Sequence, residues 1–104
     1  MDKKDKYRNI VTEVTEFYAS LQPEGDEGIQ MQEVLDSKND QYLVFAIGWD
    51  GERRVHDCVM HIALEDGKVL IQEDTTDLPV SQVLEEKGVD REDLVLGFYK
   101  RIIS

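Results

Sequence analysis

The sequence predicts an α+β fold in which a long amino-terminal helix packs on an antiparallel β-meander of about four strands, with short carboxy-terminal helices after it. Apolar residues recur at intervals of three and four from Asp2 to Leu21, which is the period of an amphipathic helix. Farther on, Asp-Gly pairs at Asp50 and Asp66 separate runs rich in β-branched and aromatic residues, as in consecutive hairpins. One domain over residues 1–104 is expected, because a chain of this length buries roughly two thirds of its unfolded surface unaided.

Acidic residues dominate the charge of the chain. There are 23 Asp and Glu residues against 12 Lys and Arg, so the formal net charge is -11. A phosphate backbone repels such a protein, which disfavours direct DNA binding, whereas a basic, DNA-handling partner suits it. A single cysteine, Cys58, cannot form an internal disulfide, and the amino terminus lacks the apolar run of a signal peptide or membrane span. We therefore expect a cytoplasmic protein with no membrane contact.

The first half of the chain contains the clearest local signals. The helix from Asp2 to Leu21 should place one apolar stripe on a flat surface. A break at residues 23–28 then leads to a weaker strand, Ile29 to Asp36, and to a turn at residues 37–40. The stripe consists of Tyr7, Ile10, Val11, Val14, Phe17, Tyr18 and Leu21.

The two hairpins define which side chains share a face of the sheet. A two-residue turn at Asp66-Gly67 pairs Leu64 with Val69, Ile62 with Ile71 and Met60 with Glu73. Strict alternation along the strand places Cys58 and His56 on that same face, and an even-numbered loop in the first hairpin adds further residues to it. We expect the amino-terminal helix to pack on this face. The added residues are Leu43, Phe45, Ile47 and Trp49.

The second face of the predicted sheet is too apolar to be fully solvated. We expect it to be covered by the carboxy-terminal segment, by a second subunit in a homodimer, or by a partner protein. Its predicted members are Val44, Ala46, Val55, Val59, Ala63 and Leu70, together with Asp57, His61 and Gln72.

The carboxy-terminal third is predicted to be helical. Residues 74–77 offer capping side chains ahead of Pro79, and a short amphipathic helix ends at Lys87-Gly88. Residues 90–93 can cap a last segment, 94–103, whose apolar residues lie on all sides and are expected to be docked.

Four neighbouring residues, His56, Asp57, Cys58 and His61, have side chains that can ligate metals or move protons. Because side chains alternate, His56 and His61 point to opposite faces and cannot share a metal unless a bulge intervenes. Cys58 is expected to be a small buried residue and His56 a structural one. Asp57 with His61 would form the site of an alternative function, a small enzyme or ligand-binding protein, although a cross-sheet hydrogen bond is favoured. No catalytic, cofactor-binding or metal-binding residue is assigned.

Trp49 beside Arg53 and Arg54 presents an aromatic ring and two cations next to the first hairpin turn. Together with His61 and the exposed acidic residues, these are the candidate contacts for a partner protein. In a second alternative, direct DNA binding, Arg53 and Arg54 would converge with the Lys100-Arg101 pair in one basic stripe.

Short sequence motifs spread over almost the whole chain occur in the same order in one known family. They are Tyr7-Arg8, residues 44–49, residues 53–56, Met60-His61-Ile62, residues 66–69, Ile71-Gln72, Gly88-Val89 and residues 94–98. In these motifs the chain resembles the XisI family of excision controlling factors.

The resemblance implies an accessory role in DNA rearrangement. Members of the family are similar to factors needed for site-specific excision of a DNA element, the fdxN element, during heterocyst differentiation in cyanobacteria. They act with a companion, XisH, which resembles restriction-type nucleases. The resemblance thus implies a regulatory protein that is not an enzyme, needs no cofactor, binds an XisH-like protein and meets DNA only through that partner.

Overall fold

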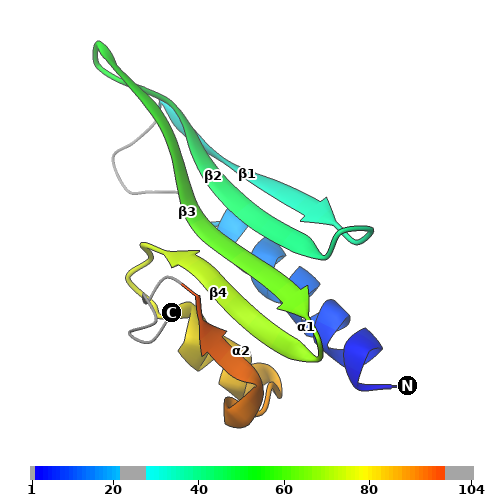
Figure 1. Cartoon of the computed structure of the whole chain (residues 1–104). Helices are drawn as coiled ribbons and strands as arrows, with labels where there is room; N and C mark the ends of the chain where they lie inside the picture. The colour runs from blue at the N-terminus through cyan, green and yellow to red at the C-terminus, as the bar shows by residue number, and fades with distance from the viewer. Residues whose placement is uncertain (1, 22–27, 98–104) are drawn as a thin grey trace, which may run out of the picture.

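The computed structural model describes residues 2–21 and 28–97 as two helices on one face of a five-stranded sheet (Figure 1). The strands follow the order of the chain, β1-β2-β3-β4-β5. The predicted α+β class, with a long amino-terminal helix on a mainly antiparallel sheet, is confirmed. The elements are α1 (Lys3–Ala19), β1 (Ile29–Asp36), β2 (Gln41–Asp50), β3 (Arg53–Glu65), β4 (Lys68–Asp74), α2 (Val80–Lys87), the 3-10 turn η1 (Arg91–Asp93) and β5 (Leu94–Leu96).

Helix α1 forms where the apolar stripe predicted it. Asp2 caps it, because a carboxylate oxygen of that residue accepts the backbone N–H of Asp5 at 2.9 Å. The helix ends at Ala19, so Leu21 lies beyond it and is exposed. Phe17 is also exposed, although it was assigned to the stripe. The buried part of the stripe is Tyr7, Ile10, Val11, Val14 and Tyr18.

Four strands form the predicted antiparallel meander, and a fifth strand extends it. The turns between β2, β3 and β4 each contain two residues, with Asp50 opposite Arg53 and Glu65 opposite Lys68. β5 pairs in parallel with β4, so the start of the segment expected to dock at the end of the chain is a sheet strand. The remainder of that segment, residues 98–103, lies outside the described residues.

Strand β3 carries a β-bulge in which Val59 is the extra residue. Cys58 lies opposite Phe45, and Met60 lies opposite Val44. Because side chains alternate along a strand, one extra residue reverses the faces of all the residues beyond it.

Because of this bulge, the side chains that face the helices differ from those predicted. The first hairpin does have an even-numbered loop, so Ile47 shares a face with its partner His56. That face is the one away from the helices, whereas Met60 and Ile62, after the bulge, lie in the core beneath α1. Cys58 is half-buried and His56 exposed, so neither belongs to the core as predicted. The β2 residues that do face the helices are Tyr42, Val44 and Ala46.

A second irregularity separates β3 from β4. Ile62 pairs with Ile71 as predicted, but Met60 pairs with Asp74 and not with Glu73. Gln72 is the extra residue there.

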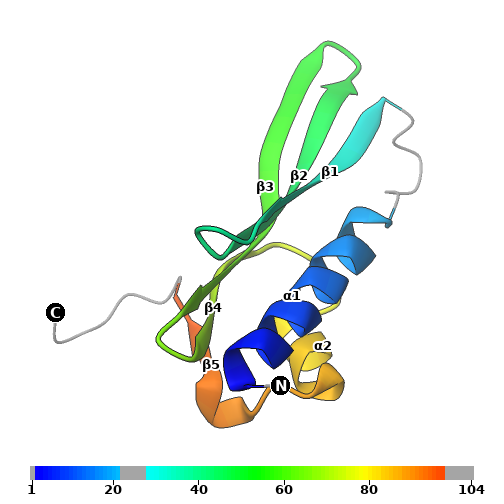
Figure 2. The same ribbon diagram turned by 90° about the vertical axis from the view of Figure 1, so that its right-hand side faces the viewer.

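The main core lies between the two helices and the sheet, and a smaller cluster of Ile29, Ala46 and Val55 supports the outer part of the β2–β3 hairpin. This hairpin extends past the helix layer (Figure 2). Of the residues predicted on the second face, Val44, Ala46 and Val55 are thus in the core. The main core consists of Tyr7, Ile10, Val11, Val14, Tyr18, Tyr42, Val44, Met60, Ile62, Val69, Ile71, Val80, Val83, Leu84 and Val89.

Helix α2 has the predicted start and stop. A carboxylate oxygen of Asp74 accepts the backbone N–H of Val80 at 2.9 Å, and Gly88 ends the helix with φ 117°. Neither helix of the described residues has the length and apolar character needed to cross a membrane.

Candidate functional site

The tip of the β2–β3 hairpin, residues 49–54, presents an exposed aromatic side chain. Trp49 is 53% exposed. The guanidinium carbon of Arg54, its partner across the strand pair, lies 5.4 Å from the centre of the Trp49 ring, and Arg54 also donates to the Gly48 carbonyl at 3.4 Å. The stacked pair therefore stands at the outer end of the molecule, where a partner can reach it.

Acidic residues balance the cations of the hairpin tip. Arg53 forms an exposed ion pair with Asp50 at 3.5 Å, and Glu52 lies between the two strands in the turn. The tip is therefore close to neutral and is not by itself a basic stripe. The Lys100-Arg101 pair that the direct DNA-binding alternative required lies outside the described residues.

His61 lies far from the tip. It is seven residues from Arg54 along β3, which corresponds to roughly 20 Å of strand. Its Nε2 is 2.7 Å from the side-chain oxygen of Gln41, and burial lowers the pKa of the imidazole below its ordinary value of 6.5. His61 therefore makes the cross-sheet hydrogen bond that was favoured from sequence, and it does not join Trp49, Arg53 and Arg54 in one patch.

The bulge also separates the predicted Asp57 and His61 pair. Asp57 lies opposite Ala46 on the helix side of β2 and β3, whereas His61 lies opposite Leu43 on the other side. The predicted pairing of Asp57 with His61 in one site is therefore wrong, because the two side chains lie on opposite faces of the sheet.

The same bulge brings His56 and His61 onto one face, with Cys58 between them. The His56 ring packs 5.7 Å from the Phe45 ring, and the Cys58 thiol donates to the Met60 carbonyl at 3.4 Å. Burial raises the pKa of this thiol, which keeps it protonated at neutral pH. Across residues 2–21 and 28–97, no group of three or more His, Cys, Asp or Glu side chains is arranged to hold a metal ion.

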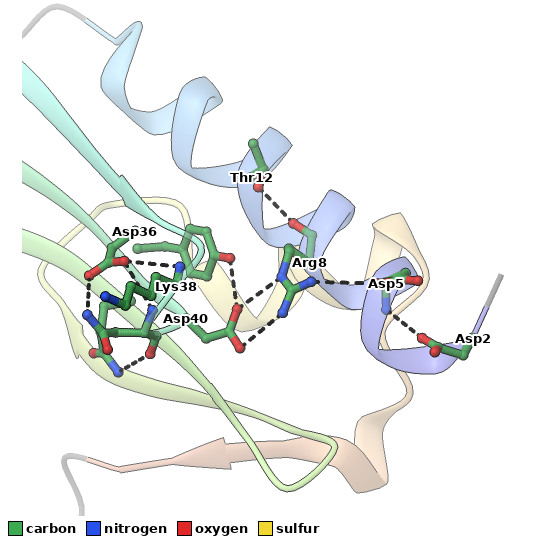
Figure 3. Close-up of polar contacts among 10 residues, drawn as sticks. Asp2, Asp5, Arg8, Thr12, Asp36, Lys38 and Asp40 are labelled. Atoms are coloured by element: carbon green, nitrogen blue, oxygen red, sulfur yellow. Dashed lines mark hydrogen bonds and ion pairs between the residues drawn. The ribbon is translucent and has the colours of Figure 1, made fainter.

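A polar network ties α1 to the β1–β2 turn (Figure 3). Arg8 donates to both carboxylate oxygens of Asp40, at 3.0 and 3.2 Å, and the Tyr42 hydroxyl donates to the same carboxylate at 3.1 Å. Arg8 holds the pKa of Asp40 below its ordinary value. Asp40 has φ 52°, so this ion pair also holds a left-handed turn residue in place.

A second network surrounds Asp93, which is 2% exposed. Its carboxylate accepts the Tyr7 hydroxyl at 2.6 Å and forms ion pairs with Lys3 at 2.7 Å and Lys68 at 3.4 Å. The Tyr7 hydroxyl in turn accepts the backbone N–H of Asp90 at 3.2 Å. Sequence reasoning noted Tyr7 and Arg8 as adjacent matching residues and could not identify their partners, which are 86 and 32 positions away.

Two hollows lie near these elements. One, of about 220 Å³, is lined by lysines and carboxylates of α1 and the hairpin turns, and its mixed charges favour no particular ligand. The other, of about 330 Å³, is mostly apolar and lies beside Tyr18, Met31, Val59 and Leu78. Both are open on one side, and neither contains a candidate residue of the sequence analysis.

Comparison with known proteins shows to which family the chain belongs. The family model described as XisI protein matches residues 1–103. The chain belongs to the XisI family. This XisI family member is similar to a XisI-like protein from Anabaena variabilis ATCC 29413, with 35% identity, a TM-score of 0.83, and coverage of 91% of this chain and 86% of that one.

A second structural relative gives the family its functional context. The fdxN element excision controlling factor XisI from Anabaena variabilis ATCC 29413 is 30% identical, with a TM-score of 0.80 and coverage of 95% of both chains. No curated protein matches. The resemblance seen in the sequence motifs is thus confirmed. The XisI family is not a known enzyme family.

Proposed function

We propose that this XisI family member controls the excision of a DNA element, of the fdxN type, as an accessory protein that is not itself an enzyme. The observation that supports this most is the similarity to the fdxN element excision controlling factor of Anabaena variabilis, which covers 95% of both chains. The recombination chemistry then belongs to other proteins.

The proposed partner is an XisH-like, nuclease-related protein. A protein that handles DNA has a basic surface, and a chain with a net charge of -11 complements it. The same negative charge opposes contact with the phosphate backbone of DNA. In this proposal the protein therefore contacts DNA only through its partner.

The hairpin tip is the proposed contact. Trp and Arg are the residues most enriched among those that dominate binding energy at protein interfaces. Trp49 and Arg54 already stack on each other in the free protein, so little side-chain freedom remains to be lost on binding. Arg53 adjoins them, whereas His61 is too far along β3 to belong to the same contact.

Co-expression with the XisH-like protein tests the proposal, with light scattering for the complex and titration of the excision-site DNA. We expect a stable complex whose DNA affinity differs from that of the partner alone. Trp49→Ala should weaken the complex by about 2 kcal/mol, or roughly 30-fold in Kd.

Phe17→Ala is the matched control, because it removes an aromatic side chain of similar exposure from α1, on the helix side of the molecule. It should leave the affinity unchanged. Two folded proteins that do not associate would remove the basis for this function, and equal losses in both variants would exclude the tip as the contact.

A further inference from the structure

The face of the sheet away from the helices, called here the open face, has no covering element among the described residues. Both helices lie on the opposite side (Figures 1 and 2). Its strand positions follow from the register, since directly opposed residues share a face. Its apolar part consists of Val34 on β1, Leu43, Phe45, Ile47 and Trp49 on β2, Cys58 and Ala63 on β3, and Leu70 on β4.

The charges of the open face nearly cancel. Its strand positions carry three carboxylates, Asp36, Glu65 and Glu73, and two cations, Arg54 and Lys68. In a chain with 23 acidic residues this is the surface where two copies can approach with little repulsion. A basic partner would instead be attracted to the acidic surfaces elsewhere on the molecule.

The polar groups on the open face can pair with copies of themselves. Gln30, Gln32 and Gln72 lie on it, together with His56 and with Gln41 and His61, which bond to each other. An amide carries both a donor and an acceptor, so a glutamine can bond to the same residue of a second copy. A two-fold interface requires this property, because the same patch contributes to both sides.

The open face has the area of a dimer interface. Four strands spaced about 4.8 Å apart and about 30 Å long on average give on the order of 600 Å². A standard protein interface buries about 800 Å² per partner, and the residues at the rim can supply the difference.

From the apolar centre, the nearly balanced charges, the amide rim and the area, we infer that the open face binds the open face of a second copy of this chain. The two sheets pack face to face in a two-fold homodimer. The inference does not rest on the excision role, but Trp49 and Arg54 lie at the outer end of this face, so a second copy and the proposed XisH-like partner would compete for them.

Two adjacent β1 residues provide a matched test. Val34 is 38% exposed on the open face, and Leu35 is 41% exposed on the helix side. Val34→Glu and Leu35→Glu change the net charge equally, and both positions are exposed enough to accept the change without loss of the fold. Sedimentation equilibrium of the wild-type chain should show a dimer at micromolar concentration. Val34→Glu should raise the dimer Kd about tenfold or more, because it buries like charges, and Leu35→Glu should not.

The wild-type chain contains its own reporter, because Cys58 is its sole cysteine and lies on the open face. Its rate of alkylation by N-ethylmaleimide should fall as the protein concentration rises through the dimer Kd. A wild-type monomer at about 100 µM would overturn the inference. Equal weakening by both variants, or a rate of alkylation that only the XisH-like partner lowers, would overturn it too.

Discussion

At the scale of single residues, Asp93 joins three parts of the chain. It is nearly fully buried, and it accepts from Tyr7 of α1 while pairing with Lys3 and Lys68 from either side. These donors, with Lys3 first, lower the pKa of Asp93 from 3.8 to about 2. The carboxylate therefore holds the start of β5 against the helix layer only while it is ionised.

The sign of the pH effect follows from that lowered pKa. Because the folded value is below the unfolded one, the stabilisation is present in full above about pH 4 and is lost as the pH falls towards 2. Asp93→Asn should thus lower the Tm at pH 7, and the difference from the wild type should shrink towards pH 2. Thermal unfolding followed by circular dichroism checks this. Asp90→Asn, at an exposed position in the same loop, is the control, and a pH-independent difference would contradict the assignment.

At the scale of elements, the start of the β1–β2 ladder, where Ile29 pairs with Gly48, depends on Gly48 and on Gly28, the residue before β1. Gly48 has φ 153°, and a β-carbon there would collide with the backbone carbonyl of Gly28. That same carbonyl accepts the backbone N–H of Trp49 at 3.1 Å, so the close approach positions the base of the hairpin tip.

Gly48→Ala should destabilise the protein by about 1–3 kcal/mol, since it adds a backbone clash to an unfavourable φ. Gly51→Ala provides the comparison, because Gly51 also has a positive φ, 65°, but has nothing within 4 Å of the position of its β-carbon. It should cost about 1 kcal/mol. Urea unfolding measures both, and equal losses would mean that the contact with Gly28 is unimportant.

The elements that the sequence predicted well are those with local signals. The stripe of α1, the Asp66-Gly67 turn and the Lys87-Gly88 stop each depend on neighbouring residues. The bulge at Val59 has no such signal, because its support is distant: the Val59 carbonyl accepts the backbone N–H of Thr75 at 3.0 Å. Strand β5 has three residues and no detectable period, and its pairing is set by β4.

The candidate site was predictable only in part, for the same reason. Trp49, Arg53 and Arg54 adjoin a turn, so their proximity could be inferred from sequence. The placement of Asp57, Cys58 and His61 depended on the number of residues in β3 opposite β2, which alternation alone could not give.

At the scale of the whole molecule, charge and apolar surface are separated. The net charge is -11, yet the open face carries acidic residues only near its edges. The two associations inferred for this protein therefore differ in sign with respect to salt. Self-association must overcome repulsion between like-charged copies, whereas binding of a basic partner gains from attraction.

Raising the NaCl concentration from about 50 mM to about 300 mM should therefore lower the Kd of the homodimer and raise that of the complex with the XisH-like protein. Sedimentation of the chain alone and titration with the partner, in the same buffers, measure the two trends. If both affinities change in the same direction, one of the two surfaces has been assigned to the wrong partner.

The single extra residue in β3 also makes that strand tolerant of one particular deletion. Without Val59, Cys58 would stay opposite Phe45 and Met60 opposite Val44, because β3 would then match β2 residue for residue. Met60 and Ile62 would keep their places in the core, and the ladder would become regular. In a strand without a bulge the loss of one residue exchanges the inside and the outside of the sheet beyond it, but here the bulge would absorb the loss.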